Sequence, residues 1–220
     1  HNSNINSIEK AMIKHSYIEK DLPPSLLVKP HGGNLINRFF EGEVSEISDT
    51  LKRIFVDKRT IMDVNHLANG VFSPLEGFLD EENFKAVLNE MRLANGIVWS
   101  IPVILQVDEE TVSEIKNEER VILSYLGDKK DYAILCVEDV YEINKSKMLK
   151  KWFGTDDLEH PGVSYIADKG NYVIGGKIQG LNNLFGFTDN IYELNPQQTR
   201  LIFSERGWSK VVGFHTRNMI

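Results

Sequence analysis

The chain has 220 residues, with 25 basic and 32 acidic side chains and a formal net charge of −7. Because domains have about 100–200 residues, this length predicts one large domain, or one domain with part of another, and it needs no disulfide or metal to fold. The single cysteine, Cys136, excludes a disulfide framework and a zinc site of two or four cysteines, and the acidic balance argues against a dedicated nucleic-acid binder.

The sequence predicts neither a membrane segment nor a secretory signal. The most apolar stretch, residues 96–105, is about half as long as a membrane-spanning helix and contains Pro102. The N-terminus is polar and lacks an apolar core segment. With one cysteine and no signal, we expect a cytoplasmic location.

The first third of the chain predicts an N-terminal arm, a tight turn and a helix. Residues 1–24 suit an adaptable arm, and residues 26–33 suit a short strand that runs into a turn at Gly32 and Gly33. Residues 63–70 predict a helix that ends at Gly70.

Two further helix starts follow in the sequence. Ser73, Pro74 and Glu76 have the spacing of a capping box with proline at the first helical position. Asp80 suits the cap of the next helix, and the apolar face of that helix would contain Phe84, Val87, Leu88 and Met91.

The middle of the chain predicts β-structure. Short segments rich in β-branched and aromatic residues are separated by turn residues; they are 103–107, 120–125, 132–137 and 171–175. This spacing is typical of a small β-barrel or a mixed sheet, and the sequence does not distinguish the two.

The C-terminal region predicts the beginning of a β/α unit. Asn195 and Pro196 begin a helix that Gly207 ends, and residues 208–214 read as a buried strand. The polar loop 215–218 then follows the carboxyl end of that strand, where open α/β sheets bind ligands. The guanidinium of Arg217 in this loop suits a phosphate or a sulfate, and an ordinary solvated connection is the alternative.

The remaining histidines give no catalytic signal. His31 suits a turn or surface position, His66 a structural position on a helix, and His160 a turn before Pro161. No His/Cys pair has metal-ligand spacing, so the sequence predicts no metal site on the chain.

Taken in order, several segments resemble the ATP sulfurylase (sulfate adenylyltransferase) family. The matching segments are Pro30-His-Gly-Gly33, Ala68-Asn-Gly-Val-Phe-Ser-Pro-Leu-Glu-Gly-Phe-Leu79, His160-Pro-Gly-Val163, Gly170-Asn-Tyr-Val-Ile-Gly-Gly176, Thr199-Arg200 through Arg206-Gly-Trp208, and Val211-Val-Gly-Phe-His-Thr-Arg-Asn218. The resemblance covers residues 30–218, nearly the whole chain.

The resemblance implies an α+β architecture in two parts. Residues 1–187 would form a PUA-like, β-rich N-terminal domain with its arm. Residues 188–220 would form the truncated start of the adenylyltransferase catalytic domain, the opening β/α unit of a Rossmann-like nucleotidyltransferase fold. The family is commonly oligomeric, which implies a homo-oligomer.

The resemblance also implies a reaction and the residues that perform it. The family converts ATP and sulfate into adenosine 5′-phosphosulfate and pyrophosphate, with Mg²⁺ accompanying ATP, in sulfate activation and assimilation. Thr216, Arg217 and Asn218 would be the catalytic residues. ATP would contact these three and His215, and sulfate would contact His215 and Arg217.

Three departures from the family pattern bear on that expectation. The family has glutamine at the position of His215 and proline at that of Met219, and its motif continues into a His-x-x-His segment beyond Ile220. We therefore expect the fragment to be inactive without further residues. A non-catalytic PUA-like module, for RNA binding or for assembly, remains the alternative, and Lys145, Lys147, Lys150 and Lys151 are the cluster that RNA phosphates would need.

Overall fold

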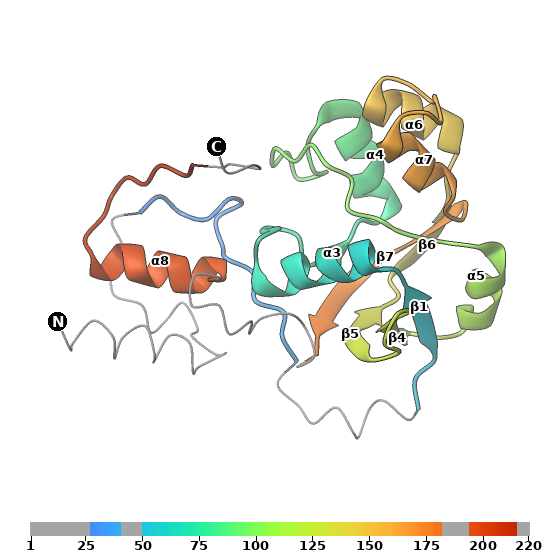
Figure 1. The fold of residues 1–220 in the computed structure, drawn as a ribbon, viewed down its shortest axis with the longest axis horizontal. Coiled ribbons are helices and arrows are strands. Elements are labelled where there is room, and N and C mark those ends of the chain that lie inside the picture. Colours follow the sequence, from blue (N-terminus) through green and yellow to red (C-terminus); the bar gives the residue numbers. More distant parts are fainter. Residues whose placement is uncertain (1–26, 41–49, 182–193, 215–220) are drawn as a thin grey trace.

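The structure is a computed structural model that describes residues 27–40, 50–181 and 194–214 (Figure 1). The strands are β1 (Arg53–Val56), β2 (Gly77–Phe78), β3 (Leu105–Val107), β4 (Arg120–Tyr125), β5 (Asp131–Cys136), β6 (Asp139–Glu142) and β7 (Tyr172–Gly180). The helices are α3 (Lys58–Asn69), α4 (Glu81–Glu90), α5 (Glu109–Ile115), α6 (Lys145–Phe153), α7 (Pro161–Ala167) and α8 (Pro196–Glu205).

The described strands form one seven-stranded mixed sheet organised around β7. The main path runs β1-β4-β5-β7-β2, in which β1 and β4 are parallel and the other pairs are antiparallel. The first half of β7 pairs with β3 and with β6, and its last residues pair with β5. The sequence left a barrel and a mixed sheet open, and the structure decides for the mixed sheet.

Glycine allows β7 to change partners halfway along its length. Gly176 has a φ of +149°, and a Cβ there would lie 1.9 Å from the carbonyl oxygen of Cys136. A residue with a side chain could not bring the two backbones so close, because non-bonded atoms repel strongly at this distance.

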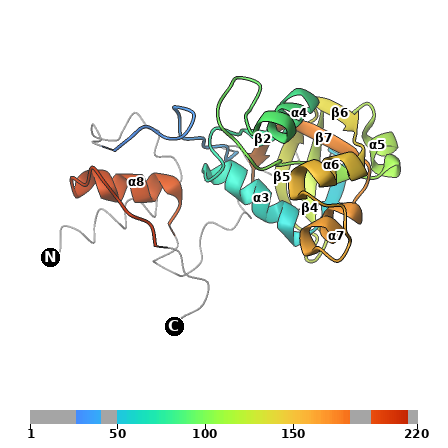
Figure 2. The ribbon, with the colours of Figure 1, turned by 90° about the horizontal axis from the view of Figure 1, so that it is seen from above.

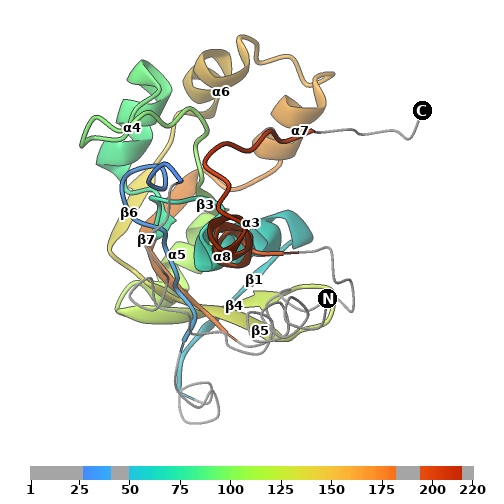
Figure 3. The same cartoon turned by 90° about the vertical axis from the view of Figure 1, so that its left-hand side faces the viewer.

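The helices lie in different places around the sheet. Figures 1 and 3 place α4, α6 and α7 together at one end of the molecule and β1, β4 and β5 at the other. Helix α3 packs on β7, β5 and β2, and its buried residues are Ile61, Val64, Leu67 and Ala68. Helix α8 lies at the opposite side of the molecule from α5 (Figures 1 and 2).

The sequence placed the start of α3 too late. The helix begins at Lys58, because the Asp57 carboxylate accepts a hydrogen bond from Thr60 N at 2.9 Å and thus caps it. Asp80 caps α4 as expected, but Met91 is not on its buried face, since it ends the helix in a left-handed conformation and is exposed.

Two motifs have other roles than the sequence predicted. No helix begins at Ser73, whose hydroxyl instead accepts from Ile36 N at 2.9 Å and donates to Gly70 O at 2.7 Å, joining two loops. His160 is not part of a simple turn. It caps α7, because its Nδ1 accepts from the backbone N–H groups of Gly162 and Val163.

The predicted opening β/α unit is half present. Helix α8 begins with the capping box of Asn195 and Gln198, and Gly207 follows its end with a φ of +66°. The strand predicted over 208–214 is not formed: Val212 is 94% exposed and Phe214 is 90% exposed. A strand needs a neighbour for its backbone hydrogen bonds, and no described strand pairs with this stretch. The predicted boundary between residues 187 and 188 lies outside the described residues and stays a prediction.

Candidate functional site

The four residues that the sequence assigned to catalysis and binding lie outside the described residues. His215, Thr216, Arg217 and Asn218 directly follow Phe214, where the described part of the chain ends. Their assigned contacts with ATP and sulfate stay predictions.

The segment that leads to this loop is attached to the rest of the protein through α8. Arg200 on α8 donates a hydrogen bond to Val28 O at 2.8 Å, and Leu201 is buried. After the helix, the Trp208 ring packs against Phe203, with ring centroids 5.8 Å apart, and lies beside the guanidinium of Arg206. The helix and this aromatic contact fix the direction in which the chain leaves α8.

Within the described residues, a pocket of about 370 Å³ opens between α3, the loop before β3, and the α6–α7 pair. Helix α3 contributes Arg59, Asp63 and His66 to it. These positions share one face because residues four and seven apart lie above one another on a helix. Aromatic residues from the other elements form much of the wall: Phe72, Trp152, Phe153 and Tyr165.

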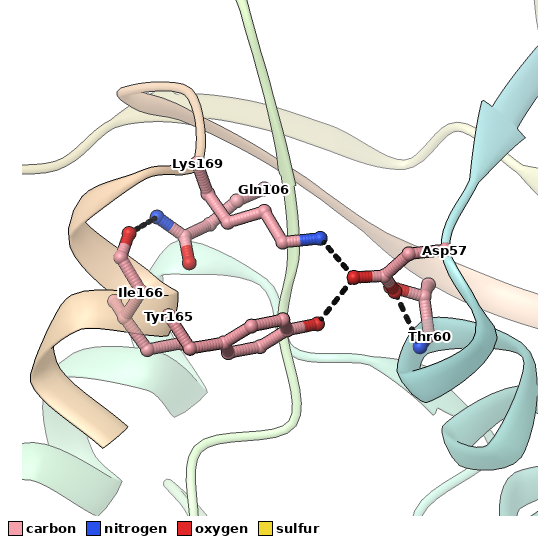
Figure 4. Close-up of polar contacts among 6 residues, drawn as sticks. All are labelled: Asp57, Thr60, Gln106, Tyr165, Ile166 and Lys169. Atoms are coloured by element: carbon pink, nitrogen blue, oxygen red, sulfur yellow. Dashed lines mark hydrogen bonds and ion pairs between the residues drawn. The ribbon is translucent and has the colours of Figure 1, made fainter. Parts of the chain in front are cut away.

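A network of polar contacts braces the rim of this pocket (Figure 4). The Asp57 carboxylate, which caps α3, also accepts hydrogen bonds from the hydroxyl of Tyr165 at 2.8 Å and from Lys169 Nζ at 2.6 Å. Figure 4 shows the Tyr165 and Lys169 side chains converging on this carboxylate from the α7 side. The network therefore joins the N-terminus of α3 to the C-terminal end of α7.

The pKa values of Asp57, Tyr165 and Lys169 suit a structural role rather than proton transfer. Burial would raise the pKa of Asp57, but the hydrogen bonds from Lys169, Thr60 and Tyr165 outweigh it and hold that pKa well below its usual range. Burial, together with the hydrogen bond to Asp57, raises the pKa of Tyr165. Burial would lower the pKa of Lys169, but the hydrogen bond to Asp57 raises it overall. All three groups keep their charge states through neutral pH.

The C-terminal end of α7 is held by two further side chains. Gln106 Nε2 donates to Ile166 O at 3.4 Å (Figure 4) and also to Gly170 O at 3.1 Å. Lys145 Nζ donates to Ala167 O at 2.7 Å and also contacts Lys169 O. These donors satisfy carbonyl groups that the end of a helix leaves without partners, so the wall of the pocket is fixed from both sides.

Asp63 and His66 are two titratable residues of this pocket, to which sequence reasoning assigned no residue. Burial, with the nearby charge of Asp57, raises the pKa of Asp63 to about 6. Burial lowers the pKa of His66, and its Nδ1 is buried without a hydrogen-bond partner among the described residues. The sequence indicated a structural position for His66, and its ring does contact Phe72, with centroids 4.9 Å apart. The spacing of Arg59, Asp63 and His66 was the signal that could have indicated their shared face.

The Phe72–Leu79 motif organises loops rather than presenting reactive groups. Glu76 pairs with Arg38 at 3.3 Å and with Lys177 at 3.6 Å. Gly32, with a φ of +76°, packs on the Pro74 ring so closely that a Cβ there would lie 2.5 Å from the proline Cβ. The motif thus holds the turn at residues 30–33 through the contact between Gly32 and Pro74.

Other features of the described residues bear on metals and membranes. Across residues 27–40, 50–181 and 194–214, no group of three or more His, Cys, Asp and Glu side chains is arranged to hold a metal ion. In the same ranges, no helix combines the length and the apolar character required to cross a membrane.

The mixed, curled sheet with helices on its faces defines an α+β domain of the PUA-like class. A family model described as a PUA-like domain matches residues 28–183, and the chain belongs to this family. A solved hexameric APS kinase from Thiobacillus denitrificans has a similar fold, with a TM-score of 0.62 and 22% identity over 83% of this chain and 32% of that one.

The sequence similarities are to sulfate adenylyltransferases. The chain is 40% identical to the enzyme of Halothermothrix orenii over 198 residues and 40% identical to that of Persephonella marina over 200 residues. Each match covers 88% of this chain and 52% of the relative, so the chain spans about half the length of these relatives. The enzyme of Neurospora crassa is 39% identical over 86% of this chain and 34% of its own length. The family resemblance inferred from the motifs is confirmed.

Proposed function

We propose that this chain is part of a sulfate adenylyltransferase, which transfers the adenylyl group of ATP to sulfate. The observation that carries the proposal is the 36–40% identity to sulfate adenylyltransferases over 88% of the chain. The products would be adenosine 5′-phosphosulfate and pyrophosphate, and the process would be sulfate activation. We place the enzyme in the cytoplasm and expect a homo-oligomer, in keeping with the hexameric state of the APS kinase of similar fold.

The reaction needs no protein nucleophile. A sulfate oxygen forms a bond to the α-phosphorus of ATP, and the bond from that phosphorus to the bridging oxygen of pyrophosphate breaks. The two reactants are both anions, so the task of the protein is to hold them together and to stabilise the charge on the transferring group. Mg²⁺ that arrives with ATP supplies neutralisation of the leaving pyrophosphate.

The loop after Phe214 would carry these roles. Arg217 would bind sulfate through its paired N–H groups and offset the repulsion between the two anions. Thr216 and Asn218 would donate hydrogen bonds to the nucleotide phosphates. His215 would contact both ligands and replaces the glutamine of the family pattern with another nitrogen donor.

The exposed stretch before the loop supports a site completed by further residues. Val212 and Phe214 are apolar and almost fully exposed. Burying them against a strand from another part of the enzyme would fix the position of residues 215–218 and remove apolar surface from water. We therefore expect activity from a longer protein that contains this chain, and none from residues 1–220 alone.

The RNA-binding alternative is not favoured by the surface. Lys150 pairs with Asp156 at 3.1 Å, Lys151 contacts the Asn89 side chain, and Lys145 is committed to carbonyl groups at the end of α7. Three members of the four-lysine cluster are thus engaged within the protein. These contacts hold the ammonium groups against the protein, and the acidic partner of Lys150 lowers the positive charge that the cluster offers to a phosphate backbone.

The test of the proposed function is adenosine 5′-phosphosulfate synthesis by a longer protein that contains this chain. Arg217→Ala should reduce the rate by more than tenfold, which corresponds to about 1.4 kcal/mol of transition-state stabilisation. Arg120→Ala removes an exposed arginine at the start of β4 and should leave the rate unchanged. A loss of less than tenfold for Arg217→Ala contradicts its assigned role.

A further inference from the structure

The pocket between α3 and α7 combines aromatic walls with two charged side chains that no described residue neutralises. Arg59 and Asp63 line it from one face of α3, and neither forms an ion pair among the described residues. By contrast, Lys169 at the rim is paired with Asp57. Asp63 is partly buried, and a partly buried charge without a partner is costly to a protein. This arrangement points to a ligand that supplies complementary groups.

Arg59 is oriented to receive an anion. Its guanidinium lies over the Tyr165 ring, 4.2 Å from the ring centroid, and the Tyr165 hydroxyl is itself fixed by Asp57. Stacking uses the flat face of the guanidinium and leaves the N–H groups at its edge free to donate. A phosphate accepts two such hydrogen bonds side by side.

Asp63 offers a different kind of contact further along the helix. The Asp63 carboxyl accepts a hydrogen bond and, because its pKa is raised to about 6, also carries a proton to donate in part of the molecules near neutral pH. His66 also lines the pocket, but its Nδ1 is covered by protein and does not face a ligand. An amino group beside a ring nitrogen presents one donor and one acceptor on the same edge and matches the acceptor and the donor of the Asp63 carboxyl.

The dimensions and walls of the pocket suit a flat ligand of moderate length. Its volume of about 370 Å³ lies at the lower end of the range for small-molecule sites. Arg59 and His66 are seven residues apart, which is about 10 Å along the helix axis. The rings of Phe72, Trp152 and Phe153 line the space and provide surfaces on which a planar base can stack.

We propose that this pocket binds a nucleoside monophosphate whose base carries an amino group, as adenine does. The edge of the base contacts Asp63, and the phosphate contacts Arg59. The inference goes beyond the proposed function, because it rests on residues of α3 and not on the loop at 215–218.

Isothermal titration of the purified protein with adenosine 5′-monophosphate tests the proposal, and adenosine and inorganic phosphate serve as partial ligands. We expect one bound nucleotide per chain and weaker binding of each partial ligand. Arg59→Ala should weaken nucleotide binding at least tenfold and leave adenosine binding unchanged. Asp63→Ala should weaken both at least tenfold, whereas Asp63→Asn should retain both within threefold, since an amide also presents a donor beside an acceptor to adenine.

Two control variants show whether binding depends on this pocket alone. Lys58→Ala removes an exposed charge beside Arg59 that does not line the pocket, and nucleotide binding should not change. Arg217→Ala should also leave it unchanged, so the pocket can fail or succeed independently of the proposed enzyme activity. If Asp63→Ala does not fold, as judged by circular dichroism, Arg59→Ala and Asp63→Asn still decide the question.

Three results would overturn the proposal. The first is that millimolar nucleotide gives no binding heat and also leaves the fluorescence of Trp152 unchanged. The Trp152 fluorescence is the part of the wild-type signal that is lost in Trp152→Phe. The second is unchanged nucleotide affinity in Arg59→Ala and Asp63→Ala. The third is equal affinity for inorganic phosphate and for the nucleotide, which would show a simple anion site.

Discussion

Lys169 Nζ lies 2.6 Å from the Asp57 carboxylate, so a residue just beyond α7 is tied to the residue that caps α3. The two residues are far apart in the sequence, and both side chains are only partly exposed. The same carboxylate accepts hydrogen bonds from Thr60 and Tyr165. One side chain thus starts a helix and also holds the wall of the pocket in place.

Asp57→Ala should reduce the stability of the protein and loosen the pocket. The loss of an N-cap costs about 1 kcal/mol, and the loss of the carboxylate leaves Lys169 and Tyr165 without their acceptor. We expect the free energy of unfolding in urea to fall by about 2 kcal/mol in total.

Asp108→Ala is the matched control for this variant. Asp108 caps the short helix α5 and accepts from Thr111 N at 2.8 Å, but no ion pair within the described residues involves it. Its loss should therefore cost about 1 kcal/mol or less. Equal losses for the two variants would show that the contacts with Tyr165 and Lys169 contribute nothing to stability.

Asp63 should make the stability of the protein depend on pH in the direction opposite to most carboxylates. Burial and the charge of Asp57 raise its pKa from 3.8 to about 6, so folding takes up a proton between these pH values. The stability contributed by this group is therefore lost as the pH rises through that interval. Asp63→Asn should raise the free energy of unfolding at pH 8 by about 1 to 3 kcal/mol and change it little at pH 4.

Urea unfolding of the wild type and of Asp63→Asn at pH 4, 6 and 8 measures this difference. Burial lowers the pKa of His66 below its ordinary value of 6.5, which gives an opposing trend, but His66 is present in both proteins and its effect largely cancels. Asp156→Asn is the control of opposite sign, because hydrogen bonds from Lys150 and Ser146 lower the pKa of Asp156. A gain for Asp63→Asn that is the same at all three pH values would contradict the assigned ionisation.

Local signals in the sequence predicted those parts of the fold that depend on neighbouring residues. Asp80 and Asn195 cap helices as expected, since a cap is made by a side chain and a backbone N–H three residues away. The β-branched segments at 120–125 and 132–137 correspond to β4 and β5, within one residue at each end, and they are buried in the sheet.

The errors arose where distant contacts decide the structure. Ser73 has the spacing of a capping box, but its hydroxyl bonds to Ile36 N, a partner 37 positions away that the local sequence does not reveal. The stretch 208–214 has the composition of a buried strand and lacks a described strand to pair with. The pocket was missed for the same reason, since it takes residues from α3, α6 and α7.

Gly77 should tolerate no side chain, because β2 and β7 approach each other closely at this point. A Cβ at Gly77 would lie 1.9 Å from the carbonyl oxygen of Gly176 and 2.6 Å from the Cα of Lys177. Both atoms belong to the backbone of β7, which also pairs with β3, β5 and β6 and cannot shift freely. Gly77→Ala should therefore lower the free energy of unfolding by at least about 2 kcal/mol.

Gly96→Ala is the comparison that separates crowding from backbone strain. A Cβ at Gly96 would meet no heavy atom within 4 Å, although its φ of +86° disfavours a side chain. Its cost should be about 1 kcal/mol, from conformation only. If the two variants lose the same stability, the close approach of β2 and β7 is not what requires glycine at position 77.

The hydroxyl of Ser73 should contribute more to the free energy of unfolding than an exposed serine hydroxyl does, because Ser73 is buried between loops. Ser73→Ala leaves Ile36 N without its partner, whereas Gly70 O keeps the backbone N–H of residue 73, and an unsatisfied buried group costs about 1–3 kcal/mol. Ser113→Ala removes a hydroxyl that donates to Glu109 O on the exposed side of α5, and it should change stability by less than about 0.5 kcal/mol. Thermal unfolding of both variants measures the difference.

Amide hydrogen exchange at Ile36 gives a local readout, since this N–H should exchange faster in Ser73→Ala and not in Ser113→Ala. Unchanged protection at Ile36 would mean that the turn at residues 30–33 is held by its packing on Pro74 and not by the serine.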